Sequence, residues 1–390
     1  MLRFVTSGES HGKCLIGVIE GLPSGLSIDL EFINFQLYRR QLGYGRGGRM
    51  RIERDQIEIL AGVRHGKTIG SPIAIKIENR DWSHWQIPMA SEPVPEGSNI
   101  RSVTRPRPGH VDLAGALKYQ TRDVRDVLER ASARETATRV AIGAFCRLLL
   151  RHFKIELGSQ VLSVGRERVA PEFELLESAE IFKIDPESAM HCADSEAEKR
   201  MMAAIDRAKE AGDTLGGIVE VVASQVPIGL GSHVQWDRKL DGQLAQALMS
   251  IPAAKAVEIG TGTQGAASFG SEVHDEIFYD AQQRRFHRRT NRAGGLEAGI
   301  TNGADLRARV YMKPIPTLRK PLRSVDLLTK EPFEAAFERS DTCVVPAAAV
   351  IAEAMVSLVL GRAFLEKFGG DSLREIEANF ASYEKLVHEY

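Results

Sequence analysis

The sequence predicts a protein of the α+β class, and three observations support this prediction. Residues 56–63 and 72–78 alternate apolar and polar side chains with a period of two, which is typical of half-buried strands. A helix is predicted after Ser132, where apolar residues recur at the spacing of one helix face. A second long helix, rich in small residues, is predicted over 346–368. Strands and helices therefore both contribute to the predicted core.

The length suits one large core or two ordinary ones, and we expect a single domain over residues 1–390. No stretch rich in Ser, Gly or charge separates two parts of the chain. The 51 Lys and Arg residues nearly balance the 52 Asp and Glu residues, so the net charge is −1. Because nucleic-acid-binding domains usually have a pI above about 9, local clusters of cations in this chain favour a small anionic ligand over a nucleic acid.

The cysteines and the apolar segments indicate a soluble protein. The four cysteines are far apart and include no Cys-x-x-Cys pair, so we expect neither a disulfide framework nor a metal site: Cys14, Cys146, Cys192 and Cys343. The N-terminus has no apolar secretory core. The longest apolar run, 344–360, contains Pro346 and Glu353 and is too short for a membrane span. We therefore expect a cytoplasmic protein with no membrane partner.

The first predicted strand covers residues 13–20 and follows a histidine flanked by glycines. The preceding residues are Gly8-Glu9-Ser10-His11-Gly12. Most histidines are structural or face solvent, and this chain has ten. A histidine in a tight loop at a strand entrance is nevertheless a candidate for proton transfer near neutral pH.

The segment from Tyr38 to Arg51 alternates arginines with glycines. Arginine presents a planar fork of donors that matches carboxylate and phosphate oxygens, and glycine lets the backbone approach a ligand closely. The segment therefore suits a compact, multiply charged anion. Two other interpretations stay open here, namely a solvated basic loop and a single-stranded nucleic acid site that uses Tyr44 for stacking.

A long segment without periodicity runs from Asn79 to His110 and ends in a basic, proline-rich motif. Loops of this length in compact proteins are usually either disordered or functional. The motif is Thr104-Arg105-Pro106-Arg107-Pro108-Gly109-His110-Val111-Asp112. The prolines stiffen the chain, so two arginines and a histidine keep fixed relative positions. A rigid basic connector is the alternative interpretation.

The helix after Ser132 begins with the pattern of a capping box, with Ser132 at the N-cap and Glu135 at N3. Unpaired N–H groups and the positive end of the dipole make a helix start attractive to anions. Arg130 and Arg134 flank this start. The sequence therefore predicts another cationic, donor-rich point at a rigid position.

The second half of the chain is predicted to add two helices, over 198–212 and 240–251, and two strands, over 218–223 and 306–312. The last strand leads into a stiff loop with a lysine and a threonine hydroxyl, Lys313-Pro314-Ile315-Pro316-Thr317. This loop is predicted either to hold a phosphate or only to leave the sheet. Asp341 precedes the final helix, and its simplest role is to favour the helix start.

Familiar catalytic motifs are absent from the sequence. It contains no His-Glu-x-x-His, no Gly-x-x-x-x-Gly-Lys-Ser/Thr and no Gly-x-Ser-x-Gly, which argues against a metalloprotease, a P-loop enzyme and a hydrolase of the nucleophile-elbow type. From the residues alone, the interpretation is an enzyme that acts on a small phosphorylated acid and uses a histidine as proton donor.

Five blocks, taken together, closely resemble the chorismate synthase family over residues 3 to about 365. In chain order they cover residues 8–12, 43–50, 105–112, 130–136 and 339–341. The resemblance implies a β-α-β sandwich, in which two antiparallel sheets enclose a helical layer, and a homotetramer. It also implies the 1,4-elimination of phosphate from 5-enolpyruvylshikimate 3-phosphate to give chorismate, with a requirement for reduced FMN.

The resemblance also implies roles for individual residues. His11 would protonate the leaving phosphate, His110 would lie by the reduced flavin and supply a proton or stabilise its anion, and Asp341 would assist proton removal. The two carboxylates and the phosphate of the substrate would meet Ser10, Arg40, Arg46, Arg49, Arg107 and Arg134. FMN contacts would come from Arg130, Ala131, Ser132, Pro252, Ala253, Ala298, Lys313, Pro314, Ile315, Pro316, Thr317 and Arg339.

Four of these flavin positions depart from the pattern of the family. Ala131 replaces a serine, Ala298 replaces a glycine, and Pro252 and Ala253 stand where Asn and Gly are usual. Backbone contacts at these positions would survive the changes better than side-chain contacts. A flavin-independent phosphate lyase and an RNA-binding protein remain the alternatives, and NADPH remains a candidate reductant of the flavin.

Overall fold

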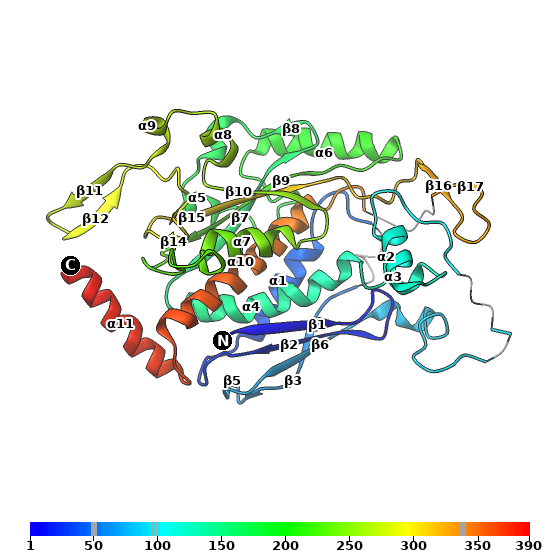
Figure 1. Ribbon diagram of the computed structural model, residues 1–390, viewed down its shortest axis with the longest axis horizontal. Coiled ribbons are helices and arrows are strands. Elements are labelled where there is room, and N and C mark those ends of the chain that lie inside the picture. Colours follow the sequence, from blue (N-terminus) through cyan, green and yellow to red (C-terminus); the bar gives the residue numbers. More distant parts are fainter. Residues whose placement is uncertain (48–52, 96, 99, 101, 336–340) are drawn as a thin grey trace.

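The protein is described here from a computed structural model, which covers residues 1–47, 53–95, 97–98, 100, 102–335 and 341–390. The chain folds into mixed helices and antiparallel sheets, so the predicted α+β class is confirmed. Two larger sheets lie on either side of a group of helices (Figure 1).

The first sheet has four antiparallel strands in the order β1-β2-β6-β3. They span Arg3–Ser7, Cys14–Glu20, Ile73–Glu78 and Ile57–Ala61, respectively. Alternate residues of β2 and β6 are buried, including Leu15, Ile19 and Ile75, because only one face of this sheet packs on the core. The strands predicted over 13–20, 56–63 and 72–78 are confirmed.

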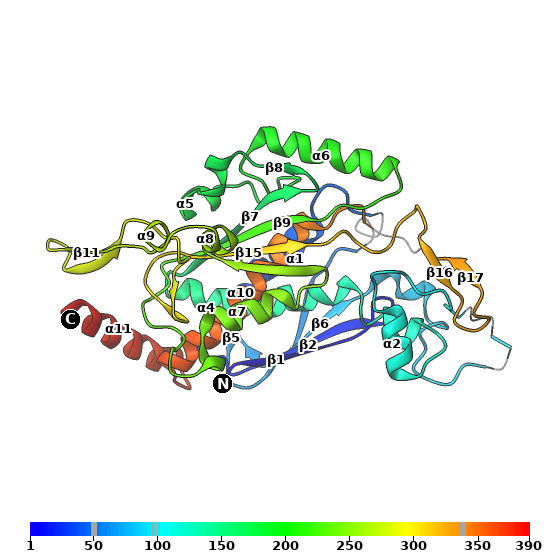
Figure 2. The same cartoon turned by 45° about the horizontal axis from the view of Figure 1, so that its top comes forward.

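The second sheet has five antiparallel strands in the order β10-β15-β9-β7-β8. They span Ala254–Ile259, Leu306–Met312, Gly217–Ser224, Glu156–Val164 and Glu167–Arg168, respectively. Nearly every residue of β7 is buried, because helices cover both faces of this sheet. Helix α6 (Ser195–Glu210) contacts β7 and β8 from outside, and α10 (Val345–Phe368) contacts β7 and β9 from inside (Figure 2).

The inner helices are α1 (Leu30–Gln41), α4 (Thr136–His152), α7 (Leu240–Met249) and α10. Helix α4 contacts β2 of the first sheet and β7 of the second. Helices α4 and α10 approach closely at Gly143, where an added Cβ would come within 2.7 Å of Ala354. Helix α10 is apolar and buried nearly all round, as expected of a central helix.

Helix α10 is the one helix in the described part of the chain with the length and hydropathy of a membrane span. However, 83% of its most apolar window is buried inside the protein. It is therefore the core helix that the sequence predicted over 346–368.

The remaining elements are smaller or lie at the periphery. Helix α11 (Leu373–Glu389) extends from the end of α10, and the hairpin of β11 (Ile277–Asp280) and β12 (Arg285–Arg288) projects from the same end of the molecule (Figures 1 and 2). At the opposite end lie α2 (Asp112–Tyr119), α3 (Arg125–Leu128) and the hairpin of β16 (Arg323–Val325) and β17 (Pro332–Glu334). Short elements complete the chain: β4 (Val63–Arg64), β5 (Lys67–Thr68), α5 (Ser178–Ile181), α8 (Gly262–Ala266), α9 (Gly270–Val273), β13 (Leu296–Glu297) and β14 (Ile300–Thr301).

The start of α4 differs from the capping box predicted at Ser132. A 3₁₀ turn, η3 (Ala133–Glu135), precedes the α-helix, and the Ser132 hydroxyl accepts a bond from Arg134 N. The Glu135 carboxylate does not return to the cap. It accepts bonds from Thr6 Oγ1 and Arg139 Nε instead, so the helix start is tied to β1.

Candidate active site

The arginine- and glycine-rich segment and the segment before α10 meet at one end of the sheets. Arg46 Nη1 lies 2.7 Å from Asp341 Oδ2, and Gly47 N donates to Asp341 Oδ1 at 2.6 Å. Thr342 N donates to Gly45 O at 2.8 Å. The first turn of α10 contains no acid and Val344 is its N-cap. Asp341 therefore binds the arginine loop and does not cap the helix.

Arg40 and Arg134 share the buried carboxylate of Asp55. Arg134 Nη1 donates to both oxygens of Asp55 at 2.6 Å, while Arg40 Nη1 lies 3.7 Å from Asp55 Oδ2. Arg40 also donates to Thr136 Oγ1 and Ala133 O, at the start of α4. Its Nη1 is buried and has no hydrogen-bond partner among the described residues. A donor of this kind is suited to an anionic ligand.

The electrostatics of Arg40 show how closely the cations gather. Burial, reinforced by the guanidinium groups of Arg46 and Arg134 and opposed by Asp55, lowers the pKa of Arg40 to about 9. Three arginines that sequence analysis assigned to the substrate therefore lie together, with Asp55 and Asp341 as their acidic partners.

Ser10 and His11 lie beside the same helix start. Ser132 Oγ donates to Ser10 Oγ at 3.1 Å, and Ser10 N donates to Glu129 O at 3.0 Å. The Arg130 guanidinium donates to the backbone oxygens of Thr6 and Gly8, at the end of β1. Arg130 and Ser132 thus contact the segment that carries Ser10.

His11 is held by Glu129 and Trp85. Its Nδ1 lies 2.9 Å from Glu129 Oε2, and its ring stacks on the Trp85 ring with centroids 4.1 Å apart. Trp85 directly follows the 3₁₀ helix η2 (Arg80–His84). It belongs to the long segment, residues 79–110, in which the sequence shows no periodicity. This part of the segment is ordered against the candidate proton donor.

A second cluster forms around Asp112. Its carboxylate accepts from Arg107 Nε at 2.8 Å and is hydrogen-bonded to His110 Nδ1. Although burial opposes ionisation, these bonds from His110 and Arg107 hold the pKa of Asp112 well below its usual range. Arg107 Nη1 also donates to Thr317 Oγ1 at 3.0 Å, so the proline-rich motif contacts the loop after β15.

The loop after β15 presents the ammonium group of Lys313, and strand β10 contributes that of Lys255 nearby. Lys313 Nζ donates to Gly109 O, and Lys313 N donates to Ala253 O at 2.9 Å. Burial and the nearby charge of Lys255 lower the pKa of Lys313. Two neighbouring ammonium groups, together with the Thr317 hydroxyl, form a donor set suited to a phosphate.

Two consecutive residues, Thr214 and Leu215, connect the loop after β15 with the segment before α10. Thr214 Oγ1 donates to Ile315 O at 2.7 Å, and Leu215 N donates to Thr342 O at 3.0 Å. Arg139 Nη1 donates to Ser250 Oγ at 2.8 Å, which places the segment before Pro252 near the start of α4. Most of the predicted residues in the described part therefore gather at one end of the molecule.

Among the described residues predicted for the flavin site, Ala298 lies apart from the others. It lies between β13 and β14, where Leu240 N donates to Gly299 O at the first residue of α7. Pro252 follows the other end of this ten-residue helix, about 15 Å away along its axis. One chain therefore does not bring Ala298 to the other predicted flavin residues. Arg49 and Arg339 lie outside the described residues.

The departures at Ala253 and Ala298 have a structural meaning. Their φ angles are +72° and +48°, in the left-handed region that favours glycine. Glycines at these positions would relieve backbone strain, so the alanines are strained substitutions.

Sequence reasoning missed the acids that hold the predicted cations. Asp55 and Glu129 received no role, although Asp55 follows the arginine-rich segment by four residues and Glu129 immediately precedes Arg130. A buried arginine needs a carboxylate partner, and this rule points to Asp55, which pairs with the buried Arg134. Glu129 contacts His11 and Arg125 instead.

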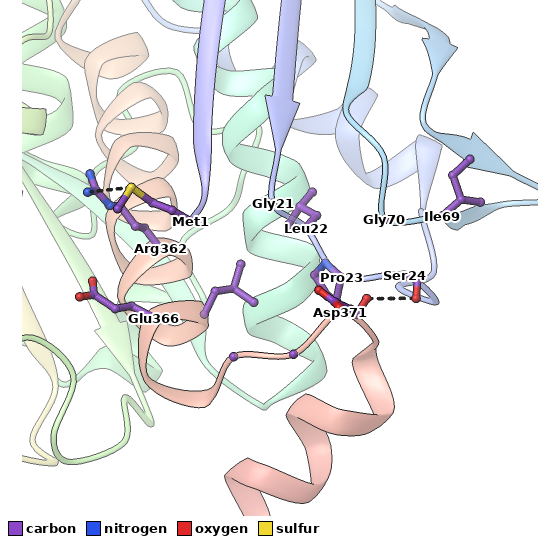
Figure 3. A pocket seen from close by; sticks show the side chains of 13 residues that line it. Met1, Gly21, Leu22, Pro23, Ser24, Ile69, Gly70, Arg362, Glu366 and Asp371 are labelled. Carbon is purple, nitrogen blue, oxygen red and sulfur yellow. Dashed lines mark hydrogen bonds between the residues drawn. The ribbon is translucent and has the colours of Figure 1, made fainter.

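A separate hollow of about 660 Å³ lies between the end of β2 and the end of α10 (Figure 3). Its lining includes one cation, Arg362, and two acids, Glu366 and Asp371. None of the predicted site residues lines it. This charge pattern does not suit a multiply charged anion.

The geometry thus defines a cluster of arginine-bearing loops, suited to a compact polyanion, beside two histidines held by buried carboxylates. The family model for chorismate synthase matches residues 2–365, and the chain belongs to this family. It is therefore a carbon–oxygen lyase that eliminates phosphate from 5-enolpyruvylshikimate 3-phosphate to give chorismate.

Relatives of known name support this conclusion over the whole length. The chain is 56% identical over 393 residues to a chorismate synthase from Solibacter usitatus, with 100% of both chains covered. It is 57% identical over 389 residues to one from Moorella thermoacetica, again with 100% of both covered. A crystal structure of a chorismate synthase superimposes with a TM-score of 0.80 at 42% identity, covering 100% of this chain and 99% of the other.

Proposed function

We propose that phosphate elimination takes place where the arginine loop, the start of α4 and the loop after β15 converge. The observation that carries this proposal is the contact of Arg46 with Asp341, because it joins two of the five family blocks across nearly the whole sequence. Arg40 and Arg134 lie within the same group of charges. The substrate, with two carboxylates and one phosphate, suits this excess of cations.

The arginines of the site divide into two kinds of role. We assign Arg40 to the substrate directly, because its Nη1 lacks a hydrogen bond within the described chain. Arg46, which lies in the same group of charges and pairs with Asp341, is assigned to the substrate with it. Arg107 and Arg134 are engaged by Asp112 and Asp55. A substrate contact by either of them exchanges or shares those bonds, so both also hold the loops in place. Arg49 and Ser10 complete the proposed set.

Reduced FMN, which the family is known to use, is proposed to bind between the start of α4 and the loop after β15. The fit rests on the paired ammonium groups of Lys313 and Lys255 and on the Thr317 hydroxyl as partners for its phosphate. When bound, reduced FMN supplies a transient electron for a reaction that is redox-neutral overall. The other proposed contacts from the same chain are Arg130, Ala131, Ser132, Pro252, Ala253, Pro314, Ile315, Pro316 and Arg339. The proposed contact of Ala298 requires a second copy of the chain, because one chain does not bring Ala298 to this site.

The proton transfers are proposed to fall to His11, His110 and Asp341. His11 is the general acid for the leaving phosphate. His110, held by Asp112, supplies a second proton or stabilises a nearby negative charge. Asp341 accepts bonds from Gly47 N and Arg46, which keep its carboxylate oriented toward the arginine loop while it assists removal of the substrate proton.

The arrangement of layers supports the sandwich of the family as one domain over residues 1–390. A single cluster of buried apolar side chains includes residues from both sheets and the helices between them, such as Ile75, Phe145 and Val221. We further propose a homotetramer in the cytoplasm. The apolar face exposed on the β11–β12 hairpin supports an assembly of copies of this chain.

One anaerobic assay tests the proposed chemistry. The chain is supplied with 5-enolpyruvylshikimate 3-phosphate, first with reduced FMN and then without flavin, and both phosphate and chorismate are measured. We expect both products only with reduced FMN. Equal release of phosphate without flavin would establish the flavin-independent lyase instead. A further arm with oxidised FMN and NADPH shows whether the chain reduces its own flavin.

The RNA-binding alternative makes a different prediction. It requires single-stranded RNA to bind with an affinity that falls steeply as salt increases. The net charge of −1 disfavours it, because nucleic-acid-binding domains usually have a pI above about 9.

A further inference from the structure

Glu129 holds both the backbone N–H and the ring nitrogen Nδ1 of His11. Glu129 Oε2 lies 2.9 Å from His11 Nδ1 and also accepts from His11 N at 2.9 Å, while Oε1 lies 3.0 Å from Nδ1. The Glu129 side chain is only 2% exposed. One buried carboxylate thus fixes both the backbone and the ring of His11.

Two further side chains, those of Arg125 and Trp85, contact Glu129 and His11. Arg125 Nη1 donates to Glu129 Oε1 at 2.9 Å, and its guanidinium carbon lies 4.9 Å from the centroid of the Trp85 ring. The Trp85 ring stacks on His11 with an interplanar angle of 28°. His11, Trp85, Arg125 and Glu129 therefore form one connected group, which we call the His11 cage.

The charge state of Glu129 follows from these bonds. Although burial opposes ionisation, hydrogen bonds from His11 and the charge of Arg125 bring the pKa of Glu129 below its ordinary value. An ionised carboxylate only accepts hydrogen bonds, so the proton in the contact lies on Nδ1. Because the two ring nitrogens lie on different edges of the imidazole, Nε2 is directed away from Glu129.

We propose that Glu129 is a positioning residue for the elimination: it keeps Nδ1 of His11 protonated and stabilises the imidazolium, so that Nε2 carries the proton for the leaving phosphate. This inference rests on the proposed role of His11 as general acid. In the step, the Nε2–H bond breaks, its electron pair stays on Nε2 and the proton bonds to a phosphate oxygen. His11 is left as a neutral imidazole that still donates from Nδ1 to Glu129.

Other charged side chains near His11 also affect its protonation. Arg130 donates to Gly8 O three residues before His11, and the Glu9 carboxylate lies against Gly12. Arg125 opposes the protonation of His11, whereas Glu129 and Glu9 favour it. Glu129 is the acid in direct contact, so its removal is expected to have the largest effect.

The test replaces Glu129 by Gln in the full chain and measures two independent quantities. The pKa and tautomer of His11 are followed by NMR of histidine labelled with ¹⁵N, with the signal assigned by its loss in His11→Gln. We expect the Glu129→Gln change to lower the pKa of His11 by about 1 unit or more. We also expect kcat near neutral pH to fall by about 10-fold or more, with a much smaller change in KM.

The pH profile of kcat separates positioning from a general loss of structure. If Glu129 acts through His11, the deficit of the Glu129→Gln enzyme shrinks as the pH falls and the imidazole becomes protonated again. Glu377→Gln is the matched control, because Glu377 pairs with His152 on the surface, with Nε2 and Oε1 2.7 Å apart. It is expected to leave kcat and the His11 signal unchanged.

Two more variants keep the inference testable if Glu129→Gln does not fold. Glu129→Asp keeps the charge and is expected to restore part of the rate. Arg125→Gln removes the positive charge that also contacts the Glu129 carboxylate. It is expected to raise the pKa of His11. An unchanged His11 pKa in both Glu129→Gln and Arg125→Gln, or a wild-type kcat in Glu129→Gln, would overturn the inference.

The outcome for His11→Gln distinguishes this inference from the proposed function. If His11→Gln turns over at the wild-type rate, the role of His11 as general acid is wrong. If His11→Gln is inactive while Glu129→Gln keeps both the rate and the His11 pKa of the wild type, only the role of Glu129 is wrong.

Discussion

Each arginine described at the candidate site has an acidic partner. Arg46 pairs with Asp341, Arg107 with Asp112 and Arg134 with Asp55. Such pairs orient guanidinium groups before the ligand arrives, and truncating one partner leaves the other charge uncompensated. The sequence motifs included Asp112 and Asp341 but not Asp55, which lies 79 positions before its partner Arg134.

Removing the acid of the Arg46 pair tests this view at the level of one residue. Asp341→Asn is expected to lower kcat by about 100-fold or more, because it removes a group that takes part in proton removal and orients Arg46. Steady-state kinetics under anaerobic conditions measures the effect. Asp185→Asn, an exposed loop acid, is the control; equal rates in the two variants would refute the role of Asp341.

The strained alanines give a prediction about stability. Ala253→Gly and Ala298→Gly are each expected to stabilise the chain by about 1 kcal/mol, because an alanine with a positive φ costs about that much. Chemical denaturation measures the change. Ala203→Gly in exposed helix α6 is expected to destabilise by a similar amount, and a loss of stability in all three variants would contradict the strain.

At the scale of elements, a buried charge network joins α1, α4 and α10. Glu353 of α10 accepts from Arg39 of α1 at 2.7 and 2.8 Å and also pairs with Arg147 of α4. Despite burial, the two arginines keep the pKa of Glu353 far below its usual range. Since Arg40 follows Arg39, this network positions the end of α1 that carries Arg40 into the site.

His191 makes the stability of this layer depend on pH. Burial and the charge of Arg39 lower its pKa from 6.5 to about 4. The unfolded chain therefore binds more protons than the folded chain between these values, and the contribution of neutral His191 is complete above pH 6.5 and lost as the pH falls toward 4. Glu353 and Asp112 stabilise the folded chain throughout this interval, and because their pKa values are depressed, their contribution is lost only as the pH falls below their ordinary values of 4.5 and 3.8.

The free energy of unfolding is accordingly expected to decrease between pH 6.5 and 4.5. His191→Asn, which tolerates the positive φ of 54° at this position, is expected to flatten the curve in this interval. Denaturation at a series of pH values measures it. A wild-type slope in the variant would show that another group is responsible.

At the scale of the whole molecule, periodicity predicted most core elements. The strand over 306–312 matches β15, and the helix over 346–368 matches α10 to within one residue. Arg39 and Arg40 were assigned to a loop but lie in the last turn of α1, because helix α1 has a weak apolar pattern. Strand β7 was not predicted either, because a strand buried on both faces shows no alternation of apolar and polar residues.

The site was predictable only in part, for a physical reason. Motifs identified which residues carry charge, but convergence of Arg46 with Asp341 and of Arg107 with Thr317 depends on contacts between residues hundreds of positions apart. Local patterns carry no information about such contacts. Resemblance to a family supplied the order of the blocks, and the fold brings most of them to one end.

The proposed tetramer gives a prediction about the projecting hairpin. Ile277 and Tyr279 of β11 are 63% and 55% exposed, and Phe286, paired with Tyr279, is 52% exposed. We expect Phe286→Lys to weaken assembly, because it puts a charge into an apolar contact. Sedimentation measures the state of assembly. Leu175→Lys, an equally apolar but separate exposed position, is the control, and an unchanged tetramer in both variants would exclude the hairpin.

The most direct measurement is a crystal structure of the chain with 5-enolpyruvylshikimate 3-phosphate and FMN bound. We predict that the substrate contacts Arg46 and lies beside His11 and Asp341, with the flavin phosphate at Lys313. A substrate bound instead in the hollow beside Arg362, or out of reach of both His11 and Arg46, would contradict the account.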